Sequence, residues 1–489
     1  MESVELIDPT EKITPEIIKK RAVKGAAILT IRTILMQTVA FFANVLLTVF
    51  LEPSQYGVFF LVSAVINFLT YFSDIGFAAA LIQKKENLTA TELKTIFTTQ
   101  QALVLILIII IYITTPLIKN IYHLNIEAMY LLWALALSLF LSSLKIIPSV
   151  LMERRLEFNK LIIPQLIETV LFNVVVVFLA WKNFGINSFT IAVLVRGFAG
   201  LLATYFIQPW IPALSFSKEA LKSILKFGIP YQINTMLAMI KDDGMTLYLG
   251  SILGPSGIGL LAWAQKWAFA PLRFFMDQVI KVSFPAFSRL QDNEKELSGA
   301  VSKSILYICL LVFPSLVMLL ILAPSFVKVI PKYYKWSPAL IALALLAINS
   351  ALAAITTPIT NTLNAIGKIS VTFKFMIMWT VLTWVFVPFL ALKFGVNGAA
   401  FGFTLVGLSS IIALILALKF VHLNYLQIIG KPLIVSTILG ISVFIIKSLI
   451  PISPVQIISM IIGGSFVYVI SIALIEPKIF DILRLKKNV

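Results

Sequence analysis

Apolar runs of about twenty residues or more recur along the whole of this 489-residue chain. A hydrocarbon core about 30 Å thick is crossed by roughly 17–25 helical residues. Lipid offers no partner to backbone polar groups, so a crossing chain forms helices or a closed barrel, and these runs lack the alternation of barrel strands. We therefore expect an all-α polytopic membrane protein with about fourteen spans: 25–50, 56–82, 93–118, 125–151, 161–182, 186–211, 228–252, 257–283, 299–322, 336–364, 369–392, 396–420, 432–450 and 455–475.

The composition excludes a soluble protein. The chain is 60% hydrophobic and 12% charged, with a mean hydropathy of +0.99, whereas a soluble domain is about 45–50% apolar and about 25% charged. The single cysteine, Cys309, lies inside an apolar run and is expected to act as a small core hydrophobe. The polar first 24 residues are not followed by a short apolar stretch with a cleavage site, so we expect no cleaved signal peptide.

The formal charge of +17 sorts by side of the membrane. With a cytoplasmic N-terminus, and with cations within six residues of a span end counted in the adjacent segment, 27 of the 39 Lys and Arg fall in cytoplasmic segments, 7 in external loops and 5 deeper within spans. This inward bias follows the positive-inside rule and predicts that both termini are cytoplasmic. The exception is the loop with Lys328, Lys332 and Lys335, which falls outside. Because the basic residues are scattered between apolar runs, nucleic acid is excluded as a partner.

Three short sequences recur at the same topological position in each half of the chain. They are LEPSQYG (51–57) with LGPSGIG (253–259), EIIKKRAVKG (16–25) with EALKSILKFG (219–228), and FGIN (184–187) with FGVN (394–397). The offsets are 202, 203 and 210 residues. An ancient duplication explains this constancy, and since six spans is an even number the two copies keep one orientation as parallel repeats.

The repeated turn also has a local reason. Pro53 and Pro255 suit a tight reversal where no helical N–H is required, while Gly57 and Gly259 relieve crowding as the next helix begins. The repeat predicts two pseudo-symmetric six-helix lobes followed by two extra helices. The expected segments are a cytoplasmic amphipathic segment (1–24), an N-lobe (25–211), an interfacial linker (212–227), a C-lobe (228–420), two further spans (432–475) and a basic tail (476–489).

Two stretches of the first half resemble a known family. LEPSQYGVFFLVSAVINFLTYFSDIGFAAALIQKK and MERRLEFNK are similar to the bacterial polysaccharide transporters, the Wzx-type oligosaccharide flippases of the multidrug/oligosaccharidyl-lipid/polysaccharide (MOP) superfamily. The second half has no clear counterpart of SDIG, although Asp277 lies near the equivalent place. The matching residues are Leu51, Pro53, Tyr56, Gly57, Asp74, Gly76, Ala80, Leu81, Gln83, Arg154, Arg155 and Phe158.

The resemblance implies a V-shaped, MATE-like transporter in the cytoplasmic (inner) membrane of a bacterium. Such a protein carries an undecaprenyl-diphosphate-linked oligosaccharide to the outer leaflet, and its first, second, seventh and eighth spans line a central cavity. Membrane lipids surround it, and a glycan polymerase and glycosyltransferases are its expected protein partners.

Five cations lie within the expected spans, where ionisable groups are costly and therefore candidates for function. A lipid diphosphate needs cations to offset its desolvation, and Arg binds phosphate oxygens bidentately. We expect Arg32, Lys241, Lys266 and Arg273 to bind the diphosphate; Lys266 and Arg273 are seven residues apart, on one helix face. The alternative is that these side chains reach the headgroups or pair with nearby acids.

Acidic residues within the spans suggest further roles. Asp242 and Asp243, in MIKDDGMT, could hold Na⁺ or share a proton and so couple transport to an ion gradient. The alternative is a structural Lys–Asp pair across neighbouring helices. Asp74, Asp277 and Arg196 are assigned gating or structural roles. Glu168, in the fifth span, is expected to pack helices through a hydrogen bond.

Enzyme chemistry finds no support in the sequence. There is no Walker A motif, and His123 and His422 stand alone without metal-ligand spacing. We therefore expect no catalytic residue, no metal site and no cofactor beyond a coupling ion. Two rivals to the flippase remain: a cation-coupled drug exporter of the same superfamily, and a membrane oligosaccharide polymerase, which would need a larger external loop.

Overall fold

Helices make up the secondary structure of this computed structural model, which describes residues 15–73, 75–84 and 86–477. The chain divides into two compact units, residues 1–259 and 260–489, called here the N-terminal and C-terminal units. The N-terminal unit holds α1 (Pro15–Phe50), α2 (Pro53–Thr70), α3 (Phe77–Gln83), α4 (Ala90–Tyr122), α5 (Ile126–Leu144), α6 (Ile146–Arg154), α7 (Phe158–Trp181), α8 (Asn187–Ile207), α9 (Lys218–Met239) and the π-helix η2 (Ile240–Gly244). Helix α10 (Met245–Arg289) continues into the C-terminal unit, which also holds α11 (Glu294–Val329), the 3₁₀-helix η3 (Tyr333–Ala339), α12 (Leu340–Ala365), α13 (Ile369–Leu408), α14 (Ser410–Ala417), α15 (Tyr425–Leu449) and α16 (Pro454–Ile475).

Twelve helical segments of the described residues are long and apolar enough to cross a membrane. Two of them are unusually long, Ile240–Met276 with 37 residues and Ile369–Ala417 with 49. Each contains a glycine with non-helical backbone angles: Gly254 (φ 63°, ψ −179°) and Gly395 (φ 58°, ψ −136°). A straight helix of 49 residues would be about 74 Å long, more than twice a hydrocarbon core. The all-α polytopic membrane fold is confirmed, while the count of fourteen spans stays a prediction.

The repeated links FGIN (184–187) and FGVN (394–397) each have a glycine with a positive φ angle. Gly185 has φ +57° and Gly395 has φ +58°. This left-handed region costs an L-residue roughly 1–2 kcal/mol, and glycine avoids the cost because it lacks a Cβ atom. The positive φ angle therefore explains why glycine stands at this position in both FGIN and FGVN.

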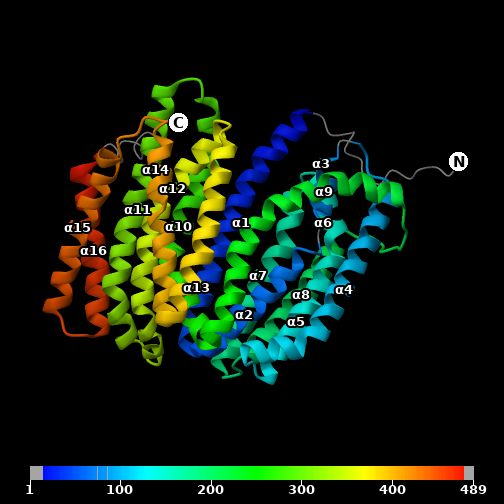
Figure 1. Ribbon diagram of the computed structural model, residues 1–489, viewed down its shortest axis with the longest axis horizontal. Coiled ribbons are helices and arrows are strands. Elements are labelled where there is room, and N and C mark those ends of the chain that lie inside the picture. The colour runs from blue at the N-terminus through cyan, green and yellow to red at the C-terminus, as the bar shows by residue number, and fades with distance from the viewer. Residues whose placement is uncertain (1–14, 74, 85, 478–489) are drawn as a thin grey trace. The chain divides into compact units, whose positions relative to one another are not determined.

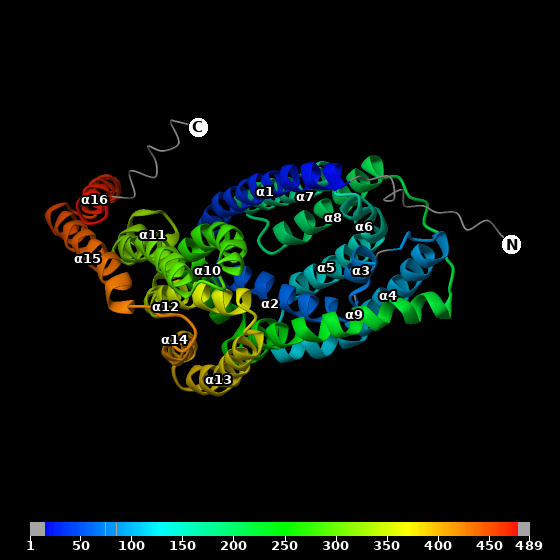
Figure 2. The same ribbon diagram turned by 90° about the horizontal axis from the view of Figure 1, so that it is seen from above.

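The N-terminal unit is built around two groups of helices. Helix α7 packs on α1 and α8, and α8 also packs on α5 (Figure 1). A second buried cluster joins α3, α4, α6 and α9 through residues such as Phe77, Leu93, Ile147 and Ile224. Helix α9 thus lies along α3 and α4 (Figure 2). The division into compact units places α9 in the N-terminal unit, whereas the sequence repeat assigns it to the second copy. The division into compact units does not test the expected lobe boundaries, which stay a prediction.

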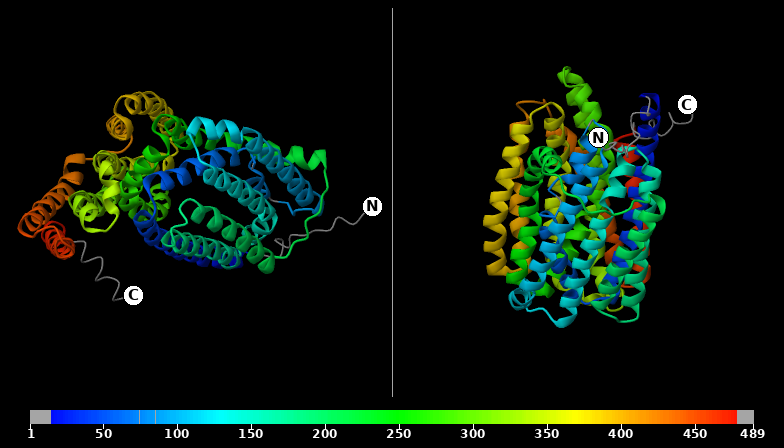
Figure 3. Two further views of the ribbon diagram at one scale, coloured as in Figure 1. Left: turned by 90° about the horizontal axis from the view of Figure 1, so that it is seen from below. Right: turned by 90° about the vertical axis from the view of Figure 1, so that its right-hand side faces the viewer.

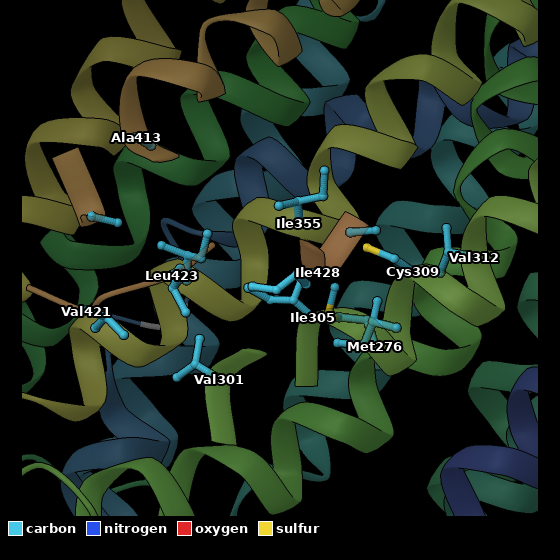
Figure 4. Packing of buried hydrophobic residues seen from close by; sticks show 14 of the residues in the cluster. Met276, Val301, Ile305, Cys309, Val312, Ile355, Ala413, Val421, Leu423 and Ile428 are labelled. Carbon is cyan, nitrogen blue, oxygen red and sulfur yellow. The ribbon is translucent and has the colours of Figure 1, made fainter. Parts of the chain in front are cut away.

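The C-terminal unit has its main core between α10, α11, α12 and α13–α15. Cys309 lies buried there among Met276, Val312 and Ile355 (Figure 4), as a small apolar side chain should. Helices α15 and α16 pack on each other and on α11, as the view from below shows (Figure 3). An ion pair between Lys431 and Glu476 ties the start of α15 to the end of α16. The two extra helices are therefore part of this unit rather than an appendage.

Candidate functional site

Helix α10 presents two cations on one stripe. Lys266 and Arg273 are both exposed and seven residues apart, and Arg273 acts electrostatically on the Lys266 ammonium. The helix is held nearby by Trp263, which stacks on Trp336 at 5.5 Å and donates a hydrogen bond to the Tyr333 hydroxyl at 3.2 Å. The side chain of Asp277, one turn beyond Arg273, lies outside the described residues. The stripe offers positive charge from a rigidly anchored helix.

Arg32 is held on the apolar helix pair α1–α7. Its Nη1 donates to Oε1 of Gln165 at 2.5 Å. Its Nε is buried and has no hydrogen-bond partner among the described residues. A buried guanidinium donor without a partner is costly, so this side chain retains a donor for which the described residues provide no acceptor.

Glu168 makes the expected hydrogen bond between helices, accepting from Lys145, and this bond is part of a larger ion-pair cluster. Its Oε1 pairs with Lys145, at the C-terminal end of α5, and its Oε2 lies 3.8 Å from Nε of Arg196 on α8. Gly200 makes room, because a Cβ atom there would lie 1.9 Å from Oε1 of Glu168. Spacing along the sequence could not show that three separate helices meet at this carboxylate.

The segment with Lys241, Asp242 and Asp243 forms the π-helix η2. π-Helical turns are rare and occur often at functional sites. Lys241 lies 3.4 Å from Asp242, which is exposed, while Asp243 is hydrogen-bonded by Asn67 of α2. This Lys–Asp pair joins adjacent residues of η2 and is not the expected pair across neighbouring helices. The two acids also have different surroundings, since it is Asp243 that contacts a second helix.

The repeated turns at 51–57 and 253–259 contact each other within the N-terminal unit. A Cβ atom on Gly57 would lie 1.8 Å from the carbonyl oxygen of Pro255, and one on Gly259 would lie 1.8 Å from that of Pro53. The relation is reciprocal, as expected where two copies meet about a pseudo-two-fold axis. The crowding that these glycines relieve comes from the other copy of the turn, not from the helix that each one begins.

Arg154 explains why the two family-like stretches occur together. Its guanidinium donates to the carbonyl oxygens of Leu81 at 2.8 Å and Glu86 at 2.6 Å, and also to that of Lys84. It thereby fixes the segment after α3 to the end of α6. The arginine of MERRLEFNK therefore holds the chain that follows SDIG, which is a structural role. Asp74 itself lies outside the described residues.

Comparison with known proteins assigns the family. The family model described as "Polysaccharide biosynthesis protein" matches residues 46–340, which is more than half of the chain. The chain belongs to this family. The lipopolysaccharide biosynthesis protein WzxC of Escherichia coli (strain K12) is 25% identical over 402 residues, covering 80% of this chain and 79% of WzxC. The succinoglycan biosynthesis transport protein ExoT of Rhizobium meliloti (strain 1021) is 23% identical over 452 residues, covering 89% and 90%.

Solved structures agree on the fold of this family member. The lipid II flippase MurJ in an inward closed conformation superimposes with a TM-score of 0.74 at 16% identity, over 93% of this chain and 100% of MurJ. A multidrug resistance MATE family transporter of the MOP superfamily in its inward-facing conformation gives 0.59 at 18% identity, over 78% and 94%. These comparisons confirm the Wzx-type and MOP assignment. The relatives are transport proteins, which agrees with the prediction that this polysaccharide biosynthesis protein is not an enzyme.

Proposed function

We propose that this protein is a flippase that moves an undecaprenyl-diphosphate-linked oligosaccharide across the bacterial cytoplasmic membrane. It would supply surface polysaccharide synthesis, acting between glycosyltransferases and a glycan polymerase. Both termini are proposed to lie in the cytoplasm, since the Lys and Arg bias favours that side. Membership of the polysaccharide family and the names of its relatives support this role over drug export, although both classes share the fold.

The observation that carries the proposal is the exposed pair Lys266 and Arg273 on α10. Two cations on one face of a spanning helix suit a diphosphate, because Arg binds two phosphate oxygens at once and Lys adds a point charge. An exporter of cationic drugs would be opposed by the same charges. We assign Arg32 and Lys241, in the N-terminal unit, to the same task of offsetting phosphate charge.

The coupling ion is assigned to η2. Asp243 supplies a carboxylate oxygen and Asn67 an amide beside it, and oxygen ligands suit Na⁺ while a lone carboxylate suits a proton. Asp242, which is exposed, would complete the charge of the site. Replacing Asp243 by Asn should abolish stimulation of transport by the ion gradient, whereas Asp292→Asn, in the exposed turn before α11, should leave it intact. Equal gradient dependence in both variants would remove Asp243 from this role.

The transport proposal is tested with purified protein in liposomes that contain undecaprenyl-diphosphate-linked oligosaccharide. Transfer between leaflets is measured by accessibility of the glycan to an added enzyme. We expect transfer by the wild type, a loss of about tenfold or more, equivalent to about 1.4 kcal/mol, in Arg273→Ala, and near-normal transfer in Arg289→Ala, an exposed arginine at the end of the same helix. The absence of transfer by folded wild-type protein would reject the function.

A further inference from the structure

A polar stripe runs along α7, a helix that is otherwise almost entirely apolar. Gln165 and Glu168 are three residues apart and so lie on one side of the helix, one turn from each other. Gln165 accepts a hydrogen bond from Arg32 of α1, and Glu168 pairs with Lys145 and Arg196. Arg32, Lys145, Glu168 and Arg196 are called here the α7 charge cluster.

The α7 charge cluster has an excess of positive charge. It contains three cations: Lys145 and Arg196 pair with Glu168, whereas Arg32 donates to the neutral side chain of Gln165. One carboxylate compensates one cation, so two positive charges stay without an anion in the cluster. Charges inside a membrane protein are strongly destabilising when they are not compensated.

The position of Arg196 makes the excess charge accessible. Arg196 is the tenth of the 21 residues of α8, and Glu168 is the eleventh of the 24 residues of α7. The side chain of Arg196 is 52% exposed, whereas those of Lys145 and Glu168 are 12% and 16% exposed. A guanidinium half-exposed midway along a spanning helix is too far from either helix end for a headgroup at rest to reach it.

Two further features indicate that Arg196 and Arg32 can donate hydrogen bonds to an acceptor from a bound ligand. Nε of Arg196 is 3.8 Å from Glu168, which is longer than a hydrogen bond, so the carboxylate does not engage the guanidinium fork. Nε of Arg32 is buried without a partner among the described residues. Both arginines therefore keep donors that suit the oxygens of a phosphate.

We propose that the α7 charge cluster is a phosphate-binding position for the lipid in transit, and that Glu168 is its internal counter-ion. Without ligand, Glu168 holds Lys145 and Arg196. When a lipid phosphate arrives, its oxygens take the donors of Arg196 and Arg32, while Glu168 stays with Lys145. The net charge of the empty α7 charge cluster is +2. A bound phosphate brings this charge closer to zero, and this lowers the free-energy cost of moving the phosphate below the membrane surface.

This inference deepens the proposed function and rests on it for the identity of the lipid. It also assigns a role to Glu168 that helix packing does not. As a counter-ion, Glu168 competes with the phosphate, so its removal should strengthen binding. As a packing residue, its removal should weaken the fold and leave phosphate binding unchanged or lower.

The test measures binding rather than transport. Purified protein in phosphatidylcholine nanodiscs is titrated with undecaprenyl phosphate, and bound lipid is counted by native mass spectrometry while thermal stability is followed in parallel. We expect Arg196→Gln to weaken binding at least fivefold and Glu168→Gln to strengthen it at least threefold. Arg289→Gln serves as the matched control and should bind like the wild type. Arg196→Lys keeps the charge without the fork and should fall between Arg196→Gln and the wild type, which keeps the test usable if a neutral variant fails to fold.

Three outcomes overturn the inference: equal binding by wild type and Arg196→Gln, weaker binding by Glu168→Gln, or displacement of the lipid by equimolar inorganic phosphate. Phosphatidylglycerol in place of undecaprenyl phosphate distinguishes the source of the phosphate, and equally tight binding of both would overturn the assignment to the transported lipid. Failure of the flippase proposal would look different, because folded wild-type protein would then show no transfer between leaflets whatever the binding results.

Discussion

The two copies of the repeat preserve their turns much more closely than their charges. Gly57 and Gly259 occupy reciprocal contacts, and Gly185 and Gly395 both have a positive φ angle of nearly equal size. Each glycine answers a requirement of the backbone, which is the same in both copies. A duplicated fold keeps such residues because every substitution at them meets an obstacle that no neighbouring side chain can remove.

The charges follow the opposite pattern. At the offset of 202, Lys266 and Arg273 correspond to Ala64 and Tyr71 of the first copy. The charged residues of η2 correspond, at the offset of 203, to Thr38, Val39 and Ala40. The first copy instead places its ionic cluster on α7 and α8. The two copies are therefore alike at the glycines that the backbone requires, and they differ at the charged residues that we propose bind a ligand.

The largest effect is expected where the two turns meet. Gly57→Ala or Gly259→Ala would place a Cβ atom 1.8 Å from a backbone carbonyl oxygen, and backbone cannot rotate away as a side chain can. Overpacking of this kind costs about 3 kcal/mol or more. We expect a large drop in the thermal unfolding temperature of the purified protein, of similar size for both variants.

Gly299→Ala provides the matched control for that prediction. This glycine lies in α11 with no atom within 4 Å of the added Cβ, so alanine should be neutral or slightly stabilising. If Gly57→Ala and Gly259→Ala differ strongly from each other, or both behave like Gly299→Ala, the reciprocal contact is not what these glycines serve.

A smaller effect is expected at Arg154, which has no arginine counterpart in the second copy at the offset of 210, where Asn364 stands. Arg154→Lys keeps the charge but cannot donate to three carbonyl oxygens in one plane. Charge-assisted hydrogen bonds contribute about 1.5–3 kcal/mol each, so we expect a loss of about 2 kcal/mol. Limited proteolysis at residues 84–89 should become faster in this variant, while unchanged cleavage would show that the segment is held by other contacts.

The smallest effect on stability is expected at the links FGIN (184–187) and FGVN (394–397). Gly395→Ala meets no atom within 4 Å, so its cost is the positive φ alone, about 1 kcal/mol. Gly185→Ala has the same φ and would also approach Nε2 of Gln55 at 2.9 Å, a flexible side chain that can move. The two unfolding temperatures should fall by similar small amounts, slightly more for Gly185→Ala; a much larger fall at Gly395 would mean that the two links are not equivalent.

Much of the fold could be predicted because membrane helices must satisfy their backbones internally. Length and hydropathy therefore sufficed for the all-helical, multi-span architecture, whereas the lobe boundaries drawn from the short repeated sequences stay a prediction. The site was less predictable. The sequence showed that Glu168, Arg196 and Asp243 are charges within spans, but their partners Lys145 and Asn67 are distant along the chain and carry no periodic signal.

The sequence by itself determined which residues are charged, which segments are apolar enough to form spanning helices, and where glycine is needed. Only the tertiary structure decided that Gly57 meets Pro255, that Arg154 holds the chain after α3, and that Glu168 lies between two cations. The physical reason is that local properties, such as hydropathy and backbone freedom, depend on a residue and its neighbours in the sequence. Contacts between helices depend instead on packing that brings together residues on different helices, from 23 positions apart for Lys145 and Glu168 to almost 200 for Gly57 and Pro255.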